Sequence, residues 1–142
     1  MEKLITKNES ETYEYGVKLA TRLRGGEVLA LYGDLGAGKT KFLQGLAKGL
    51  GVKTKVNSPT FNILKLYKVI NNKNIKAFCH IDAYRLRSGK DLISLGVEEF
   101  FQSNEIITAI EWAEKIEKIL PKGAVVIHIR NIDENTREIR IK

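Results

Sequence analysis

Residues Gly33 to Thr40 have the types and the spacing that bind a polyphosphate. Gly33 and Gly38, followed by Lys39 and Thr40, satisfy the pattern G-x-x-x-x-G-K-[ST] of a P-loop. Glycine permits a tight loop whose backbone N–H groups point at phosphate oxygens, and the helix that follows adds the positive end of its dipole. We expect Lys39 to reach the β- and γ-phosphates and the Thr40 hydroxyl to bind Mg²⁺. The motif therefore predicts a site for a magnesium–nucleotide complex.

The segments on either side of the P-loop support this interpretation. Residues 28–32 form an apolar run that is typical of a strand buried on both faces. A helical pattern follows from about Lys39 to Leu50, with an apolar stripe that begins at Phe42. The alternative is a glycine-rich turn with an incidental Lys-Thr pair, and the strand–loop–helix context argues against it.

Two carboxylates could complete the site, because a P-loop enzyme needs an acidic residue at the end of a neighbouring apolar strand. Asp82 ends the segment AFCHID, and Glu111 ends the segment IITAIE. Either carboxylate could bind Mg²⁺ directly or through water, and one could position the attacking water. The sequence does not separate these two roles, and either residue could instead cap a helix.

Other polar groups near these segments each have a structural and a functional interpretation. His80 lies two residues before Asp82 and therefore shares a strand face with it. The triplet Ser58-Pro59-Thr60 is either a plain turn or a nucleotide-sensing loop. Trp112 is either a core anchor or a neighbour of the nucleotide, and Tyr84-Arg85 could reach the site or a partner.

The rest of the pattern predicts an α/β fold with a mixed central sheet flanked by helices. Strands are expected at residues 3–6, 28–32, 61–70, 75–81, 106–110, 125–129 and 138–141. Helices are expected at 39–50 and 113–120, and one or two short helices, interrupted near Gly96, at 90–101. A further helix should begin after Asn8 or Ser10 and end at Arg24 before two glycines, with Tyr13, Val17 and Ala20 roughly on one face. The short turn at 71–74 should join antiparallel strands, so the sheet should be mixed.

Composition limits the classes of protein that fit. A chain of 142 residues suggests a single domain over residues 1–142, without room for a separate substrate domain. No window approaches the ~20 apolar residues of a membrane span, and the first residues lack the apolar core of a secretory signal. The lone Cys79 fits a reducing compartment. These features predict a cytoplasmic protein without a membrane partner.

The net charge of +7 has two interpretations. One is a lysine-rich solvated surface, and the other is attraction to a nucleic acid or to an acidic protein. No run contains more than two adjacent basic residues, which favours the solvated surface.

Four segments together resemble the bacterial TsaE family, also called YjeE. They are YGDLGAGKT (32–40), SPTF (58–61), HIDAYRL (80–86) and EW (111–112), and the resemblance covers nearly the whole chain. It implies a small P-loop ATPase that works in tRNA threonylcarbamoyladenosine biosynthesis with the proteins TsaB and TsaD. The TsaB–TsaD pair transfers the threonylcarbamoyl group to tRNA. The TsaE-like member would hydrolyse ATP in support of that complex and would meet tRNA only through it.

The resemblance also assigns roles to individual residues. It implies that ATP or ADP is held by Leu35, Gly36, Ala37, Gly38, Lys39 and Thr40, with further contacts from Glu9, Trp112 and Arg137. It makes Thr40 and Glu111 the Mg²⁺ ligands and gives Asp82 an assisting role toward the metal or the water. The catalytic set would be Lys39, Asp82 and Glu111. Lys41 departs from the family, which often has a small hydroxyl residue there.

Two other functions compete with this one. A small-molecule kinase would need an acceptor pocket and an arginine-rich lid, for which the chain is short, and only Arg85 and Arg87 cluster. A nucleic-acid or partner-binding module with a vestigial nucleotide site is the other alternative, and its binding to tRNA should weaken steeply with salt.

Overall fold

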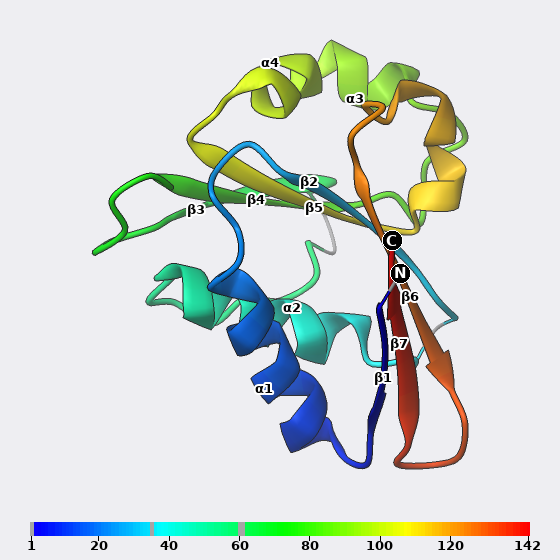
Figure 1. Cartoon of the computed structure of the whole chain (residues 1–142). Coiled ribbons are helices and arrows are strands. Elements are labelled where there is room, and N and C mark those ends of the chain that lie inside the picture. The colour runs from blue at the N-terminus through cyan, green and yellow to red at the C-terminus, as the bar shows by residue number, and fades with distance from the viewer. Residues whose placement is uncertain (1, 35, 60–61) are drawn as a thin grey trace.

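The computed structural model describes residues 2–34, 36–59 and 62–142, and these form a mixed seven-stranded sheet with helices on both faces (Figure 1). The strands are β1 (Glu2–Thr6), β2 (Val28–Tyr32), β3 (Leu64–Lys68), β4 (Ala77–Asp82), β5 (Ile106–Glu111), β6 (Val125–Asn131) and β7 (Arg137–Ile141). The helices are α1 (Glu9–Ala20), α2 (Lys39–Leu50), α3 (Lys90–Ser94) and α4 (Val97–Gln102), with 3₁₀ turns η1 (Ala113–Lys115) and η2 (Glu117–Ile119). The predicted fold class is confirmed.

The strand order, β1-β7-β6-β2-β5-β4-β3, places the P-loop strand at the centre. β2 pairs in parallel with both β5 and β6, and β4 also runs parallel to β5. β3, β7 and β1 add antiparallel pairs at the two edges. The carboxyl ends of β2, β4 and β5 therefore meet at one edge of the sheet, which is where an α/β protein binds its ligands.

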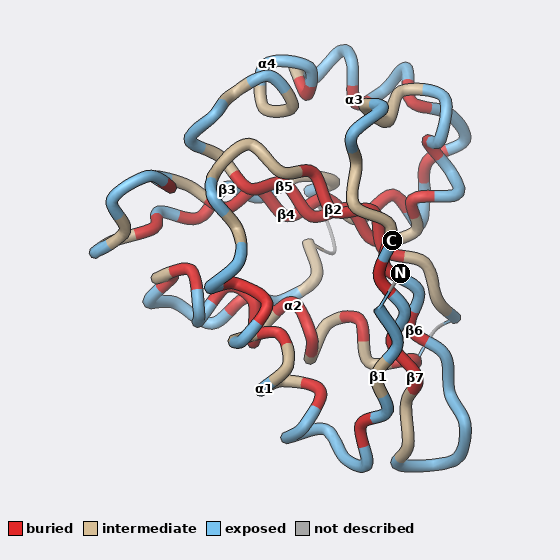
Figure 2. The backbone as a smooth tube through the Cα atoms, in the orientation of Figure 1, coloured by how far each residue is buried: buried red, intermediate tan, exposed pale blue. Residues whose placement is uncertain are grey.

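Two apolar clusters cover the two faces of the sheet. Leu29 and Leu31 of β2 lie in the cluster with α1 and α2, whereas Val28 and Ala30 lie in the cluster with α3 and α4. Burial on both sides accounts for the unbroken apolar run of β2 (Figure 2). No helix among the described residues has the length and apolar character needed to cross a bilayer.

α1 and α2 pack unusually closely, and glycines make this approach feasible. A Cβ on Gly16 would lie 2.8 Å from Leu46 N, and one on Gly45 would lie 2.8 Å from the Tyr13 carbonyl carbon. α1 therefore buries the face that carries Gly16. The prediction that Tyr13, Val17 and Ala20 share one face is confirmed, because Gly45 of α2 lies against Tyr13, and Gly49 lies against Val17 and Ala20; Tyr13 and Val17 themselves are half-buried. Gly49 lies inside α2, and Gly51 is its C-cap.

Two helix predictions need correction. α1 begins after Asn8, whose side chain accepts a hydrogen bond from Glu11 N, but it ends at Ala20 rather than Arg24. After Ala20 the bonds change to the tighter i→i−3 type, as from Arg22 N to Leu19 O, and Gly26 N then bonds to Ile106 O of the sheet. Residues 113–120 form two 3₁₀ turns instead of a helix, because the extended φ of −135° at Ile116 separates them.

Candidate functional site

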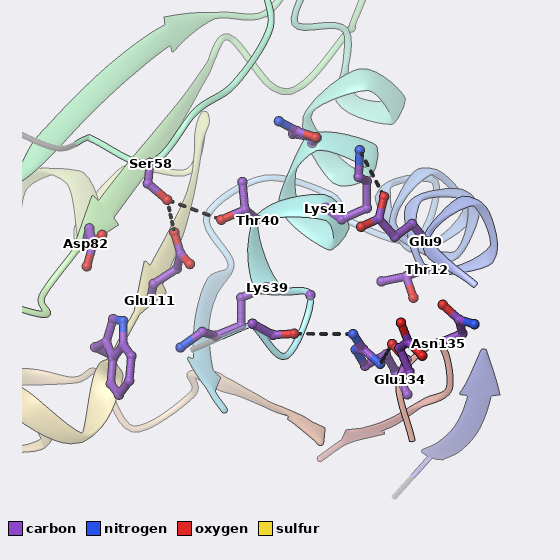
Figure 3. A pocket seen from close by; sticks show the side chains of 15 residues that line it. Glu9, Thr12, Lys39, Thr40, Lys41, Ser58, Asp82, Glu111, Glu134 and Asn135 are labelled. Carbon is purple, nitrogen blue, oxygen red and sulfur yellow. Dashed lines mark hydrogen bonds and ion pairs between the residues drawn. The ribbon is translucent and has the colours of Figure 1, made fainter. Parts of the chain in front are cut away.

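A cavity of about 480 Å³ lies at the carboxyl ends of β4 and β5, above the P-loop (Figure 3). Fifteen described residues line it: Glu9, Thr12, Gly36, Gly38, Lys39, Thr40, Lys41, Gln44, Ser58, Asp82, Glu111, Trp112, Glu134, Asn135 and Arg137. Segments from the first helix to the last hairpin thus meet at one place. Most of the residues predicted to hold nucleotide or metal are among them. Leu35 lies outside the described residues.

The P-loop has the backbone geometry that an anion site requires. Gly33, Gly36 and Gly38 all have positive φ values, of 155°, 81° and 97°. Gly38 is the N-cap of α2 in a left-handed conformation, and no described side chain caps the helix there. Ala37 is buried, and its N–H bonds to Asp34 O within the loop. The first N–H groups of α2 therefore remain as donors for a bound anion.

The side chain of Lys39 is almost completely shielded from solvent. Its side chain comes from a residue that is only 5% exposed, donates to the Gly33 carbonyl, and lies with Nζ 3.7 Å from the centre of the Trp112 ring. Burial lowers the pKa of Lys39 below its usual value, and attraction to Glu111 and other carboxylates opposes this. A phosphate would supply the acceptors that such an ammonium group needs.

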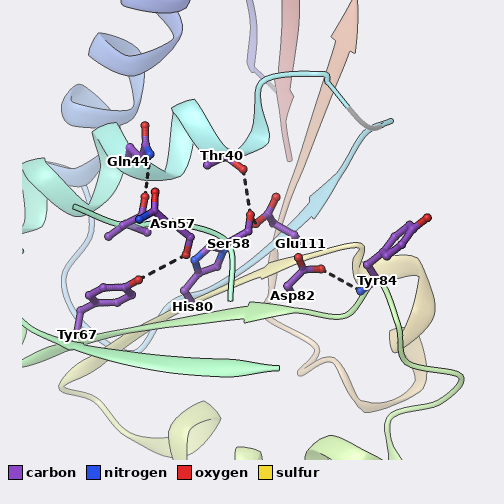
Figure 4. A network of polar contacts seen from close by, with 10 residues as sticks. Thr40, Gln44, Asn57, Ser58, Tyr67, His80, Asp82, Tyr84 and Glu111 are labelled. Atoms are coloured by element: carbon purple, nitrogen blue, oxygen red, sulfur yellow. Dashed lines mark hydrogen bonds and ion pairs between the residues drawn. The ribbon is translucent and has the colours of Figure 1, made fainter. Parts of the chain in front are cut away.

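A chain of polar contacts joins α2 to β4 and β5 (Figure 4). Ser58 Oγ lies 3.2 Å from Thr40 Oγ1 and donates to Glu111 Oε2 over 3.3 Å. The same Glu111 oxygen lies 2.7 Å from Nε2 of His80, which is fully buried. With Glu111 ionised, the Nε2–H of His80 is the donor. Ser58 thus bridges the two residues expected to hold the metal.

These donors fit Mg²⁺, which prefers oxygen ligands and keeps few protein ones in nucleotide sites. The Thr40 hydroxyl and the Glu111 carboxylate both line the cavity. Asp82 is the register partner of Glu111 on the adjacent strand and lines the same cavity. No group of three or more His, Cys, Asp or Glu side chains is placed to hold a metal within the described residues. A magnesium ion here would therefore depend on phosphate oxygens and water as well.

Trp112 contacts both the cavity and its surroundings. It has φ 59° and ψ 44°, a left-handed conformation that is rare for a bulky residue and clusters at functional sites. Its ring packs on Tyr84 at 5.0 Å between centroids and also adjoins the core cluster under α3 and α4. The two interpretations of Trp112 are therefore compatible, since it is half-buried and still lines the cavity.

Arg137 and Glu9 reach the cavity from opposite ends of the chain. Arg137 Nη2 donates to Gly36 O over 3.3 Å, and its Nη1 donates to backbone carbonyls of its own hairpin, including that of Asp133. Glu9 lies 3.9 Å from Nζ of Lys41, the residue that departs from the family pattern. The added lysine thus has a carboxylate partner beside the phosphate site.

Four lining residues were missed from the sequence: Thr12, Gln44, Glu134 and Asn135. Gln44 follows Thr40 by one helical turn, so its position on the same helix face was a usable signal. It anchors the Ser58 loop by donating to Val56 O over 2.8 Å. No such signal existed for the others, because only tertiary contacts bring them to the P-loop. Arg85 does not line the cavity, and Thr60 lies outside the described residues.

Comparisons with known proteins agree with this geometry. A model of the family described as "Threonylcarbamoyl adenosine biosynthesis protein TsaE" matches residues 6–139. The TsaE protein of Bacillus subtilis is 40% identical over 134 residues, which are 94% of this chain and 80% of that protein. That of Treponema pallidum is 34% identical and covers 96% of this chain and 97% of its own. The crystal structure of Bacillus subtilis YdiB superposes with a TM-score of 0.77 at 35% identity, over 97% of this chain and 82% of that one.

Proposed function

Because this chain belongs to the TsaE family, we propose that it is an ATPase that binds and hydrolyses Mg–ATP in support of a TsaB–TsaD complex. That complex would form N6-threonylcarbamoyladenosine at the adenosine next to the tRNA anticodon, and this chain would not be the transferase. One observation carries the proposal: Lys39 and Thr40 at the start of α2 and Glu111 at the end of β5 line one cavity with Gly36 and Gly38 of the P-loop.

In this proposal the chain binds the phosphates mainly through its backbone. The N–H groups of Gly36, of Gly38 and of the first turn of α2 donate to the phosphate oxygens, and Lys39 neutralises their charge. Arg137, which already contacts Gly36, adds a second positive group at the rim. Trp112 supplies an aromatic surface beside Lys39.

For hydrolysis, Asp82 orients the attacking water and accepts its proton. As the water oxygen bonds to the γ-phosphorus, the bond from that phosphorus to the β–γ bridging oxygen breaks, and ADP and inorganic phosphate are released. Mg²⁺, when bound at Thr40 and Glu111, would neutralise charge on the phosphate oxygens. His80 holds the Glu111 carboxylate in place from below. Ser58 contacts both Thr40 and Glu111. When the metal and the nucleotide bind these two residues, the Ser58 hydroxyl would change its hydrogen bonds, and the conformation of the loop around Ser58 would then depend on the bound nucleotide.

Turnover by the isolated chain should be slow. Arg137 is the arginine among the described residues that line the cavity, and its guanidinium is already engaged by backbone carbonyls. Stabilisation of the transferring phosphoryl group by an arginine is worth about 10³–10⁵ in rate when a partner supplies it. We therefore expect TsaB and TsaD to change the rate of ATP hydrolysis.

The test is phosphate release from Mg–ATP by the chain alone and after TsaB and TsaD are added. We expect a low basal rate that changes at least tenfold with the pair present. Asp82→Asn should bind ADP normally and lose the stimulated rate. An unchanged rate with the partners, together with normal tRNA modification in reactions that lack this chain, would rule the proposal out.

A further inference from the structure

The charges of the chain are divided very unevenly along the sequence. Residues 35–81 contain nine of the 17 lysines and none of the 17 aspartates and glutamates. Two of these lysines, Lys39 and Lys41, belong to the nucleotide cavity. The seven that remain are called here the lysine-rich end: Lys48, Lys53, Lys55, Lys65, Lys68, Lys73 and Lys76. A lysine-rich composition alone does not explain why acidic residues are missing from the same stretch.

The fold gathers these seven lysines at one end of the molecule. They lie on the last turn of α2, on the segment after it, and on the β3–β4 hairpin, which Figure 1 shows side by side. An antiparallel bridge between Val52 and Val69 ties the segment to the hairpin, so Lys53 and Lys68 occupy adjoining positions. A polar hollow of about 200 Å³ between α2 and the hairpin tip is lined by Lys48, Lys53 and asparagines of the tip.

The positive charges of the lysine-rich end are not neutralised by the protein. All seven lysines are exposed, and no described carboxylate forms an ion pair with any of them. Lys76 donates only to a backbone carbonyl, and Lys65 lies over the Tyr67 ring. Glu105 touches this region through its backbone, which accepts from Lys76 N, and its carboxylate pairs with none of the seven. The region therefore presents a concentrated positive potential to the solvent.

The chemistry of this region favours a phosphodiester backbone over a protein. Protein interfaces are depleted in lysine, whereas this region presents seven exposed lysines. Lysine acts as a flexible point charge that suits phosphates without fixing a sequence. The relatives are tRNA threonylcarbamoyladenosine biosynthesis proteins, so RNA is the polyanion that we consider as the ligand.

We infer that the lysine-rich end binds the phosphate backbone of RNA directly, at a site separate from the nucleotide cavity. This contact goes beyond the proposed function, in which tRNA is met only through the partner complex. Binding would be governed by charge and would therefore be weak in sequence preference and strong in salt dependence. It requires neither ATP nor hydrolysis.

The test measures fluorescence anisotropy of a labelled tRNA transcript with the full chain, without nucleotide or partners, from 50 to 300 mM KCl. We expect micromolar affinity at the lowest salt and a log–log salt slope that corresponds to several released counterions, about 0.7–0.9 per phosphate contact. The triple variant K53Q/K68Q/K73Q should bind about tenfold more weakly at 50 mM KCl and lower the slope by about 2. The matched control K115Q/K118Q/K122Q has the same net charge but alters lysines of the η1–η2 region, and it should bind within threefold of the wild type.

Folding of both variants is checked by their unchanged affinity for Mg–ADP. Lys39→Ala should retain RNA binding, which separates this inference from the proposed ATPase activity. The inference fails if no binding is seen up to 100 µM protein at about 50 mM KCl, or if both triple variants weaken equally. It also fails if polyglutamate of matched charge competes as well as unlabelled tRNA, since an acidic protein would then be the better occupant.

Discussion

Lys39 and Glu111 are buried in the cavity at a cost in free energy that a bound magnesium–nucleotide complex would lower. Lys39 is buried with one described carbonyl acceptor, and Glu111 is 3% exposed with its Oε2 already engaged by His80 and Ser58. An ammonium and a carboxylate kept this dry cost free energy unless a ligand completes their contacts. The site is therefore organised before its ligand arrives, with charge of both signs in place.

Replacing Lys39 by alanine should remove most nucleotide affinity while the chain stays folded. A charge-assisted hydrogen bond contributes about 1.5–3 kcal/mol, so we expect the Kd for Mg–ADP to rise about 10- to 100-fold in calorimetry. Lys48→Ala is the matched control, because Lys48 lies on the same helix and is exposed outside the cavity. Equal affinities for the two variants would contradict the role given to Lys39.

Replacing His80 by alanine should weaken magnesium binding more than nucleotide binding. His80 fixes the Glu111 carboxylate, and outer partners of metal ligands are typically worth 10- to 100-fold in metal affinity. We expect about a tenfold loss of Mn²⁺ affinity in the ADP complex, measured by electron paramagnetic resonance, and an unchanged ADP affinity in EDTA. A parallel loss in both measurements would indicate general destabilisation instead of positioning.

At the scale of elements, local sequence patterns predicted the bounds of individual strands and helices. The bounds of α2 and β2 follow directly from their apolar periodicity and from the glycines that flank them. The end of α1 was not predicted, because no glycine or proline marks Ala20, after which the bonds change to the tighter i→i−3 type. The site residues were predicted by motif, and those among the described residues, apart from Ala37, line one cavity, while their roles stay predictions. Contacts between these residues, such as those of Ser58 with Thr40 and Glu111, depend on the register of the sheet and could not be predicted from the sequence.

The close contact of α1 with α2 should fail if either helix gains a side chain there. A Cβ on Gly45 would lie 2.8 Å from the Tyr13 carbonyl carbon, so Gly45→Ala must push the helices apart. Overpacking of this kind costs about 1–3 kcal/mol, which outweighs the better helix propensity of alanine. Urea unfolding should show the loss, whereas Gly123→Ala, with no atom within 4 Å of its new methyl group, should change stability by less than about 0.5 kcal/mol. A neutral Gly45→Ala would disprove the close contact.

At the scale of the whole molecule, segments that are distant in sequence surround the cavity. Glu9 begins α1, Ser58 lies after α2, and Arg137 begins the last strand, yet all three line the same space. A ligand that contacts each of them would tie the two halves of the sheet together. Nucleotide binding should therefore stabilise the complete fold and not only the P-loop.

Thermal unfolding offers the most direct measure of this coupling. A ligand at 100 times its Kd stabilises a folded protein by about 2.7 kcal/mol, so saturating Mg–ADP should raise Tm by roughly 10 °C for a chain of this size. Removal of magnesium with EDTA should reduce the shift, because Thr40 and Glu111 would then make no metal contact. Lys39→Ala, with a Kd about 10- to 100-fold higher, should retain only about one half to one sixth of the shift at the same ADP concentration. A shift that is equally large in EDTA would mean that the metal contributes nothing to binding, and Thr40 and Glu111 would lose the role assigned to them.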